Sequence, residues 1–127
     1  HASSVATQDL LERARLSHIA DELVANLAHG QQRQLEIGMA LAGAPRLILF
    51  DEPAAGLSPA ERRELVALLR SPPEHMSFVL IEHDLDIALS VTERVTVMHN
   101  GRVLKTGTPS EIENDAQVQA IYMGSKH

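Results

Sequence analysis

The chain has 127 residues, of which 44% are hydrophobic and only 2% aromatic, which is enough for one core of aliphatic side chains. Its formal net charge of −6 argues against nucleic acid as the main partner, because binding to phosphates favours a basic surface. It contains no cysteine, which excludes a disulfide framework and a thiolate metal site. No apolar run approaches the roughly 20 residues that span a bilayer. The first residue is His1 and not Met, so we expect a processed, truncated or engineered piece of a protein.

Helical patterns fill the first third of the chain. After a frayed start, the sequence predicts a short helix over residues 9–16 with Thr7 as its N-cap. Apolar residues recur at helical spacing over residues 19–27, which predicts that the helical structure continues there. A turn that contains Gly30 precedes a further predicted helix over residues 31–42, and a glycine and a proline end that helix.

Two continuous apolar runs predict strands that are buried on both faces. They cover residues 47–50 and 77–81, and such runs are typical of a parallel sheet. Between them, Ser58 has the sequence context of an N-cap, for a helix that runs to about Arg70. A shorter helix over residues 85–91 follows the second strand.

The last part of the chain predicts a hairpin and a final helical stretch. The pair Asn100–Gly101 is a strong turn signal between strands at residues 94–98 and 102–106. A helical stretch then begins at about residue 109 and runs towards Tyr122. Alternating strands and helices followed by a hairpin indicate an α/β fold with an at least partly parallel sheet. On such sheets, ligands bind at the carboxyl ends of the strands.

The first apolar strand delivers two carboxylates to its carboxyl end. Asp51 can hold Mg²⁺, because this cation prefers oxygen ligands, and Glu52 can polarise an attacking water. The alternative is that both are solvated groups in a turn before Pro53. The strand alone does not decide between the two interpretations.

Two further places carry candidate residues. His83 follows the second strand, where it could reach a phosphate or hold a water, although a histidine at a strand end is often an ordinary surface residue. The turn at residues 28–31 leads into a helix N-terminus, where backbone N–H groups and the helix dipole favour phosphate. The alternative for this turn is a glycine between two packed helices.

The order of four motifs raises the odds of function at all these places. Along the chain, L-A-H-G-Q-Q-R is followed by L-I-L-F-D-E-P, A-G-L-S-P and I-E-H-D. In this order they resemble the signature motif, the Walker B strand, the D-loop and the switch histidine of the ATP-binding cassette (ABC) family. The resemblance covers nearly the whole chain. The wording N-L-A-x-G-Q-Q-R-x-L-E-I and D-E-P-A-A-G-L is similar to the branched-chain amino acid importers of that family.

The resemblance implies the C-terminal part of a P-loop NTPase-type parallel sheet with flanking helices, followed by a C-terminal β-hairpin. Residues 1–43 would be the end of the helical subdomain with the signature helix. Residues 44–108 would be the ATPase core with the Walker B strand, the D-loop and the switch histidine, and residues 109–127 would be a C-terminal tail.

The resemblance also implies a role for each candidate residue in a complete subunit. Asp51 would help to place Mg²⁺, Glu52 would act as the base on water, and His83 would stabilise the γ-phosphate. The signature turn and the D-loop would contact ATP held by the opposite subunit of a head-to-tail dimer, and the residues concerned are Ala28, His29, Gly30, Gln31 and Ser58. The implied cofactors are ATP and Mg²⁺.

The sequence departs from the family pattern in several places. Ala28 replaces the serine of the signature motif, His29 stands at a glycine position, and Ser58 stands where the D-loop commonly has an aspartate. These changes put the strength of the contact with ATP in doubt. They do not abolish it, because Gly30 and the helix N-terminus remain. The phosphate-binding loop G-x-x-x-x-G-K-[ST] does not occur in the sequence, because Ala44–Pro45 follow the one glycine pair with this spacing. We therefore expect a fragment that completes no ATP site by itself.

The function implied by the resemblance is that of the C-terminal half of the ATP-hydrolysing subunit of an importer, for branched-chain or other hydrophobic amino acids. Such a subunit would work with transmembrane permease subunits, as a peripheral protein on the cytoplasmic face of the inner or plasma membrane. Two alternatives remain open: a non-enzymatic regulatory or binding module that docks on a full-length ATPase, and a soluble α/β domain with incidental carboxylates.

Overall fold

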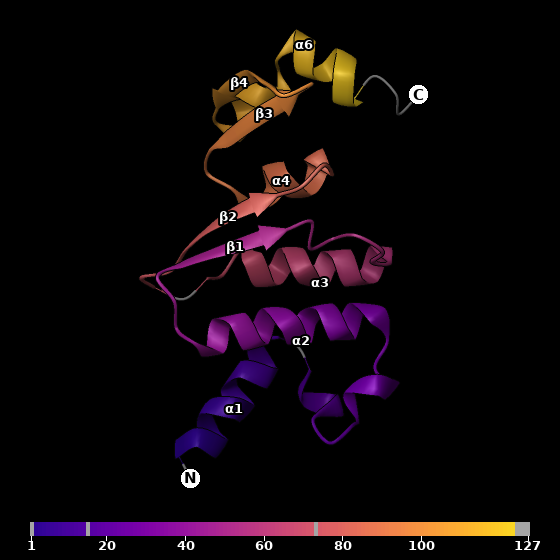
Figure 1. The fold of residues 1–127 in the computed structure, drawn as a ribbon, viewed down its shortest axis with the longest axis vertical. Helices are drawn as coiled ribbons and strands as arrows, with labels where there is room; N and C mark the ends of the chain where they lie inside the picture. The colour runs from indigo at the N-terminus through magenta and orange to yellow at the C-terminus, as the bar shows by residue number, and fades with distance from the viewer. Residues whose placement is uncertain (1, 15, 73, 124–127) are drawn as a thin grey trace. The chain divides into compact units, whose positions relative to one another are not determined.

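The computed structural model describes residues 2–14, 16–72 and 74–123 (Figure 1). The chain divides into two compact units, His1–Ile81 and Glu82–His127. Among the described residues, no helix combines the length and the apolar character needed to cross a bilayer.

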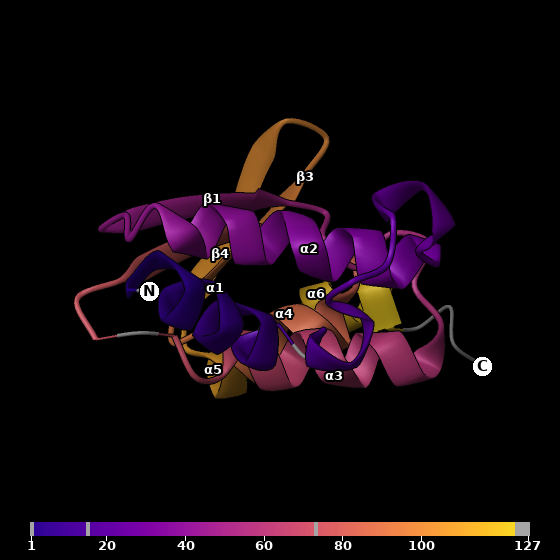
Figure 2. The ribbon, with the colours of Figure 1, turned by 90° about the horizontal axis from the view of Figure 1, so that it is seen from below.

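The first unit contains several helical segments, of which α2 is the longest among the described residues. Its helical segments, as far as the chain is described, are α1 (Ala2–Arg13), the 3₁₀ turns η1 (Ser17–Ile19) and η2 (Val24–Asn26), α2 (His29–Ala42) and α3 (Pro59–Leu69). Helix α2 confirms the helix predicted over residues 31–42, and α3 begins after the predicted N-cap Ser58. Helices α1 and α2 lie side by side (Figures 1 and 2).

Two predictions for the N-terminal helices are wrong. Helix α1 begins at Ala2, so Thr7 lies inside it and is not its N-cap. The sequence of α1 contains no glycine or proline, and nothing therefore stops the helix between the chain start and Arg13. Residues 19–27 do not form a continuous α-helix, because Leu23 is extended, with φ −70° and ψ 137°. Its side chain is 71% exposed, so the helical spacing of apolar residues corresponds to no buried stripe.

The two apolar runs form the predicted parallel pair. Strands β1 (Leu47–Asp51) and β2 (Ser77–Ile81) are parallel, and their register aligns Leu49 with Val79 and Asp51 with Ile81. The expected burial on both faces is wrong, however. Ile48 is 7% exposed, whereas its neighbour Leu49 is 71% exposed. Within the described structure, one face of the pair is packed and the other carries exposed apolar side chains.

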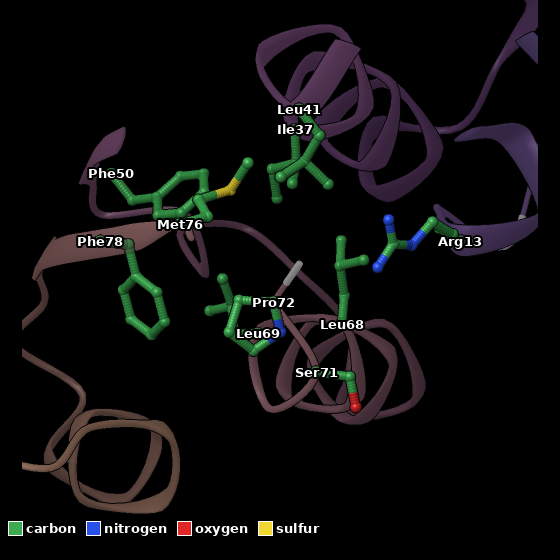
Figure 3. A pocket seen from close by; sticks show the side chains of 10 residues that line it. All are labelled: Arg13, Ile37, Leu41, Phe50, Leu68, Leu69, Ser71, Pro72, Met76 and Phe78. Carbon is green, nitrogen blue, oxygen red and sulfur yellow. The ribbon is translucent and has the colours of Figure 1, made fainter. Parts of the chain in front are cut away.

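The packed face of the sheet meets α2 and α3. Figure 3 shows Phe50 and Phe78 from the two strands at a pocket that is also lined by Ile37 of α2 and Leu69 of α3. The two phenyl rings make an edge contact, with centroids 6.0 Å apart and planes at 64°. The buried apolar residues of this unit are Ala14, Leu16, Ile37, Ile48, Phe50, Ala54, Leu65 and Leu69. This aliphatic core fixes the strand β1 that carries the candidate carboxylates.

The second unit contains the predicted hairpin. Its elements are α4 (Leu85–Val91), β3 (Val95–His99), β4 (Arg102–Gly107), α5 (Pro109–Glu113), α6 (Ala116–Val118) and the π-helical turn η3 (Gln119–Met123). Strands β3 and β4 are antiparallel around Asn100 and Gly101, whose φ angles of 50° and 75° suit a tight hairpin turn. The final stretch is broken into short helices because Asp115 caps a new one, accepting from the N–H groups of Gln117 and Val118. Ile112 and Val118 are fully buried beside Val97.

The start of α5 makes the stability of this unit sensitive to acid. The backbone N–H and then the hydroxyl of Thr108 hydrogen-bond to Glu111, and with the charge of Lys105 they lower the pKa of Glu111 from its ordinary value of 4.5. A lowered pKa in the folded state adds stability above about pH 4.5, and this stability is lost as the pH falls through the folded pKa.

We expect the melting temperature of the chain to fall as the pH is lowered from 6 to 3, and Glu111→Gln to remove part of this fall. Glutamine keeps a hydrogen-bond acceptor for the Thr108 N–H but cannot titrate. Thermal unfolding followed by circular dichroism at several pH values measures the effect. An unchanged pH dependence in the variant would count against Glu111 as a contributor.

Candidate functional site

Strand β1 carries the candidate carboxylates to the carboxyl end of the parallel pair. Asp51 is the last residue of β1 and is exposed, and Glu52 follows it. The Glu52 N–H donates to the Ile81 carbonyl at 2.7 Å, so the ladder with β2 continues one residue past the strand. The backbone of both candidates is therefore fixed by the sheet, at the edge where α/β sheets bind ligands.

The backbone of Glu52 has an unusual conformation. Its φ is 49°, in the left-handed region that glycine adopts readily and other residues adopt at a cost. Ala44, His75 and Asn100 share this sign of φ at exposed turns, whereas Glu52 continues a strand and is half-buried. The Glu52 carbonyl accepts from the Ala55 N–H at 3.2 Å, and this closes a turn over the buried Ala54. Such a conformation, held by its surroundings, is common at functional sites.

The residues at the end of β1 suit a magnesium ion. Mg²⁺ in phosphate-transfer sites takes one or two carboxylates and fills its other positions with water and phosphate oxygens. Asp51 offers one exposed carboxylate, with that of Glu52 next in sequence. Among the described residues, there is no group of three or more metal-ligating side chains. The donor set therefore fits a site shared with a phosphate and does not fit a closed all-protein metal cage.

The turn at residues 28–31 forms the N-terminus of α2. Ala28 is the extended N-cap residue, and its backbone N–H donates to the Gln31 side-chain oxygen at 2.9 Å. Gln31 thus completes half of a capping box, and the methyl group of Ala28 cannot supply the other half. In this structure, the side-chain oxygen of Gln31 serves the helix cap.

His29 and Gly30 bring this turn against the segment after β1. The His29 ring Nε2 lies 3.3 Å from the Ala55 carbonyl oxygen. A carbonyl only accepts, so Nε2 must carry the proton in this contact. Gly56, with φ 75°, leaves room for the ring, because a Cβ at that position would lie 3.1 Å from Nε2. Both the conformation and the close approach favour glycine at position 56.

The Glu61 carboxylate lies against Gly30. Glu61 forms a full capping box with Ser58. The Ser58 N–H donates to Oε1 of Glu61 at 2.9 Å, and the Glu61 N–H donates to Oγ of Ser58 at 3.2 Å. A Cβ built on Gly30 would overlap the Glu61 carboxylate. The backbone N–H of Ser58, then its hydroxyl, and more weakly the His29 charge and the Gly30 N–H lower the pKa of Glu61. The carboxylate is therefore shared between the N-termini of α2 and α3.

His83 lies in the second unit, two residues after β2. Its side chain is exposed, and its backbone N–H donates to the Glu82 carboxylate at 3.1 Å. The same carboxylate accepts from the Asp84 N–H at 3.3 Å, and Asp84 caps α4 through the Ile87 N–H at 3.2 Å. The backbone around His83 is thus held by the Glu82 carboxylate before it and by the N-cap of α4 after it.

The structure brings together more of the predicted residues than sequence spacing suggests. His29 contacts the segment between β1 and α3, which begins with Glu52 directly after Asp51 and ends with Ser58. Gly30 contacts Glu61, in the first turn of α3. The contact between Glu61 and Gly30 was not predicted from the sequence. The S-x-x-E pattern was visible, but no sequence signal pairs it with a glycine 31 positions earlier.

Comparison with known proteins gives consistent matches. The model of the ABC transporter family matches residues 2–55. The branched-chain amino acid transport ATP-binding protein LivG of Salmonella typhimurium is 40% identical over 116 residues, which are 90% of this chain and 46% of LivG. The lipopolysaccharide export ATP-binding protein LptB of Haemophilus influenzae is 35% identical over 121 residues, 93% of this chain and 49% of LptB.

Solved structures agree with these relatives. The ADP conformation of MJ1267, an ATP-binding cassette of an ABC transporter, superimposes with a TM-score of 0.80 and 32% identity. It is matched over 98% of this chain and 51% of its own length. The predicted α/β fold, a P-loop NTPase-type parallel sheet with a hairpin, is thereby confirmed. The chain is similar in sequence and fold to the ATPase domain of ABC transporters, and it spans about half the length of the curated relatives it matches.

Proposed function

We propose that the chain is the C-terminal half of an ATP-hydrolysing ABC subunit and contributes the hydrolytic residues of its ATP site. The observation that carries this proposal is the end of β1, where Asp51 and the left-handed Glu52 stand at the carboxyl edge of a parallel pair. Ala44, His75 and Asn100 adopt a positive φ at exposed turns, whereas Glu52 adopts it half-buried at the end of a strand, where such a conformation is common at functional sites.

Each residue has a role that follows from its chemistry. Asp51 would hold Mg²⁺, which lowers the cost of charge on the phosphate oxygens. Glu52 would accept a proton from the attacking water or orient it, and His83 would hold the γ-phosphate and the water. The turn at residues 28–31 and Ser58 would contact ATP bound by the opposite subunit of a head-to-tail dimer, through Gly30 and the N-terminus of α2.

The transported solute and the partners are a further part of the proposal. We infer import of branched-chain or other hydrophobic amino acids, because LivG at 40% identity and BraF of Pseudomonas aeruginosa at 39% are both named for branched-chain amino acid transport. LptB at 35% identity is named for lipopolysaccharide export, and the higher identity of LivG and BraF favours amino acids as the solute. The expected partners are permease subunits, with the ATPase peripheral on the cytoplasmic face of the membrane.

The 127-residue chain alone should release no phosphate from ATP above background, whereas the complete subunit with its phosphate-binding loop should be an Mg²⁺-dependent ATPase. The reason is that the N–H groups and the lysine of that loop hold the β- and γ-phosphates, and this chain supplies neither. Phosphate release by both proteins, with and without Mg²⁺, measures the difference. The same pair of proteins carrying Glu52→Gln controls for a contaminating ATPase.

The outcomes separate the two candidate functions. Turnover by the chain alone that Glu52→Gln abolishes would show that the site is complete without a phosphate-binding loop. An inactive complete subunit that still binds a full-length ATPase would favour the regulatory module over the hydrolytic subunit.

A further inference from the structure

Two contacts join the N-terminus of α2 to the turn after β1 and to the N-terminus of α3. In one, the His29 ring meets the Ala55 carbonyl at 3.3 Å, and in the other the Glu61 carboxylate lies against Gly30. We call these two contacts the α2–α3 latch. Both join residues that are 26 or more positions apart in sequence, so they tie the signature turn to the segment after β1.

Ala55 connects the latch to Glu52, the candidate base. Ala55 accepts from His29 through its carbonyl oxygen, and its N–H donates to the Glu52 carbonyl at 3.2 Å. Glu52 is held in its left-handed conformation by this turn on one side and by the Ile81 carbonyl on the other. A shift of the signature turn would therefore be transmitted to the backbone of Glu52.

The residues of the latch suit the transmission of such a shift to Glu52. The ring of His29 stands where the family pattern has glycine, and a glycine has no side chain with which to reach Ala55. The Ser58 N–H holds the Glu61 carboxylate at 2.9 Å, so the carboxylate cannot move away from Gly30 without breaking this hydrogen bond. Gly56 leaves the space that the ring occupies.

We propose that His29 and Glu61 are positioning residues that make the signature turn and the turn after β1 move as one body, so that docking on ATP and the placement of Glu52 are coupled. This inference rests on the proposed function. It assigns to His29 a contact within its own subunit, in addition to any contact with nucleotide.

The test uses the complete subunit and compares His29→Leu with His29→Gln. Leucine fills a similar volume without a donor, whereas glutamine keeps an N–H that reaches about as far as Nε2. We expect His29→Leu to lower kcat about tenfold with little change in KM for Mg-ATP, since a misplacement of about 1 Å can cost up to about 100-fold. His29→Gln should restore most of the lost kcat.

Glu61→Gln and a matched control complete the experiment. Glu111 has the same capping box with Thr108 and is not part of the latch, so Glu111→Gln removes an equivalent charge from a helix N-terminus outside the latch. Glu61→Gln should lower kcat and Glu111→Gln should not. The double variant His29→Leu/Glu61→Gln should lose less than the product of the two single losses, because both act through one latch.

Other results would overturn the latch and not the proposed function. If the wild-type subunit hydrolyses ATP but His29→Leu raises KM alone, His29 contacts nucleotide directly. Equal kcat values for the Glu61 and Glu111 variants would show that Glu61 acts only as a helix cap. A double variant whose loss of kcat is the product of the two single losses would show the same. A wild-type subunit that neither binds nor hydrolyses ATP would instead refute the proposed function.

Discussion

Replacing Glu52 by glutamine in the complete subunit should lower ATP hydrolysis by about 100- to 10,000-fold, or roughly 3–5 kcal/mol in the barrier. Glutamine keeps the size and shape of the side chain but loses its charge and basicity. Because β1 and the turn to Ala55 fix the backbone of Glu52, the substituted side chain should remain in place. Mg-ATP binding should persist, and the variant should accumulate as an ATP-bound dimer.

Asp51→Asn is the matched control, one residue earlier on the same strand. It should weaken Mg-ATP binding itself, because it removes a carboxylate that Mg²⁺ prefers. Turnover and Mg-ATP affinity are measured for both variants. If both carboxylates were merely solvated groups at the end of β1, both substitutions would be nearly neutral, and near-normal hydrolysis by the Glu52 variant would refute its role as the base.

The 127-residue chain by itself should self-associate through the open face of β1 and β2. Four side chains on this face are half or more exposed: Leu47 at 56%, Leu49 at 71%, Val79 at 50% and Ile81 at 58%. Full burial of one such side chain stabilises by about 1.5–3 kcal/mol. Covering the exposed half of all four by a second copy would thus contribute roughly 3–6 kcal/mol, or two to four orders of magnitude in the dissociation constant.

The double variant Leu49→Thr/Val79→Thr should weaken this association about 10- to 100-fold, since it removes about half of the apolar contribution. Threonine keeps the strand propensity of both positions. Val103→Thr, at a 59% exposed valine on β4 in the other unit, is the control and should change little. Sedimentation velocity over a range of concentrations measures the effect, and a chain that stays monomeric at every concentration would contradict it.

The strands, the hairpin turn and the N-cap of α3 could be predicted because each has a local cause. The apolar runs of β1 and β2, the Asn100–Gly101 turn and the N-cap Ser58 act over a few residues, and the structure confirms them. Burial could not be predicted in the same way. An apolar run indicates that a strand can be covered on both faces, but it does not reveal whether a second layer is present to cover Leu49.

The candidate site was predictable in its residue types and not in its geometry. The order of the motifs singled out Asp51 and Glu52, and the parallel register places them at one edge of the sheet. The left-handed backbone of Glu52 has no sequence signature, because glutamate is not a residue that favours it. The contact between Gly30 and Glu61 depends on the packing of α2 and α3, which helix patterns do not specify.

If Glu52 is the base that we propose, its left-handed conformation opposes stability to function at one position. Glycine would adopt a φ of 49° without strain, so the fold itself gains nothing from a glutamate there. Under selection for thermostability alone, as in directed evolution without an activity screen, glycine or asparagine would be favoured and the carboxylate discarded. A consensus drawn from stable variants would then converge on inactive proteins, and engineering of this chain should keep position 52 fixed.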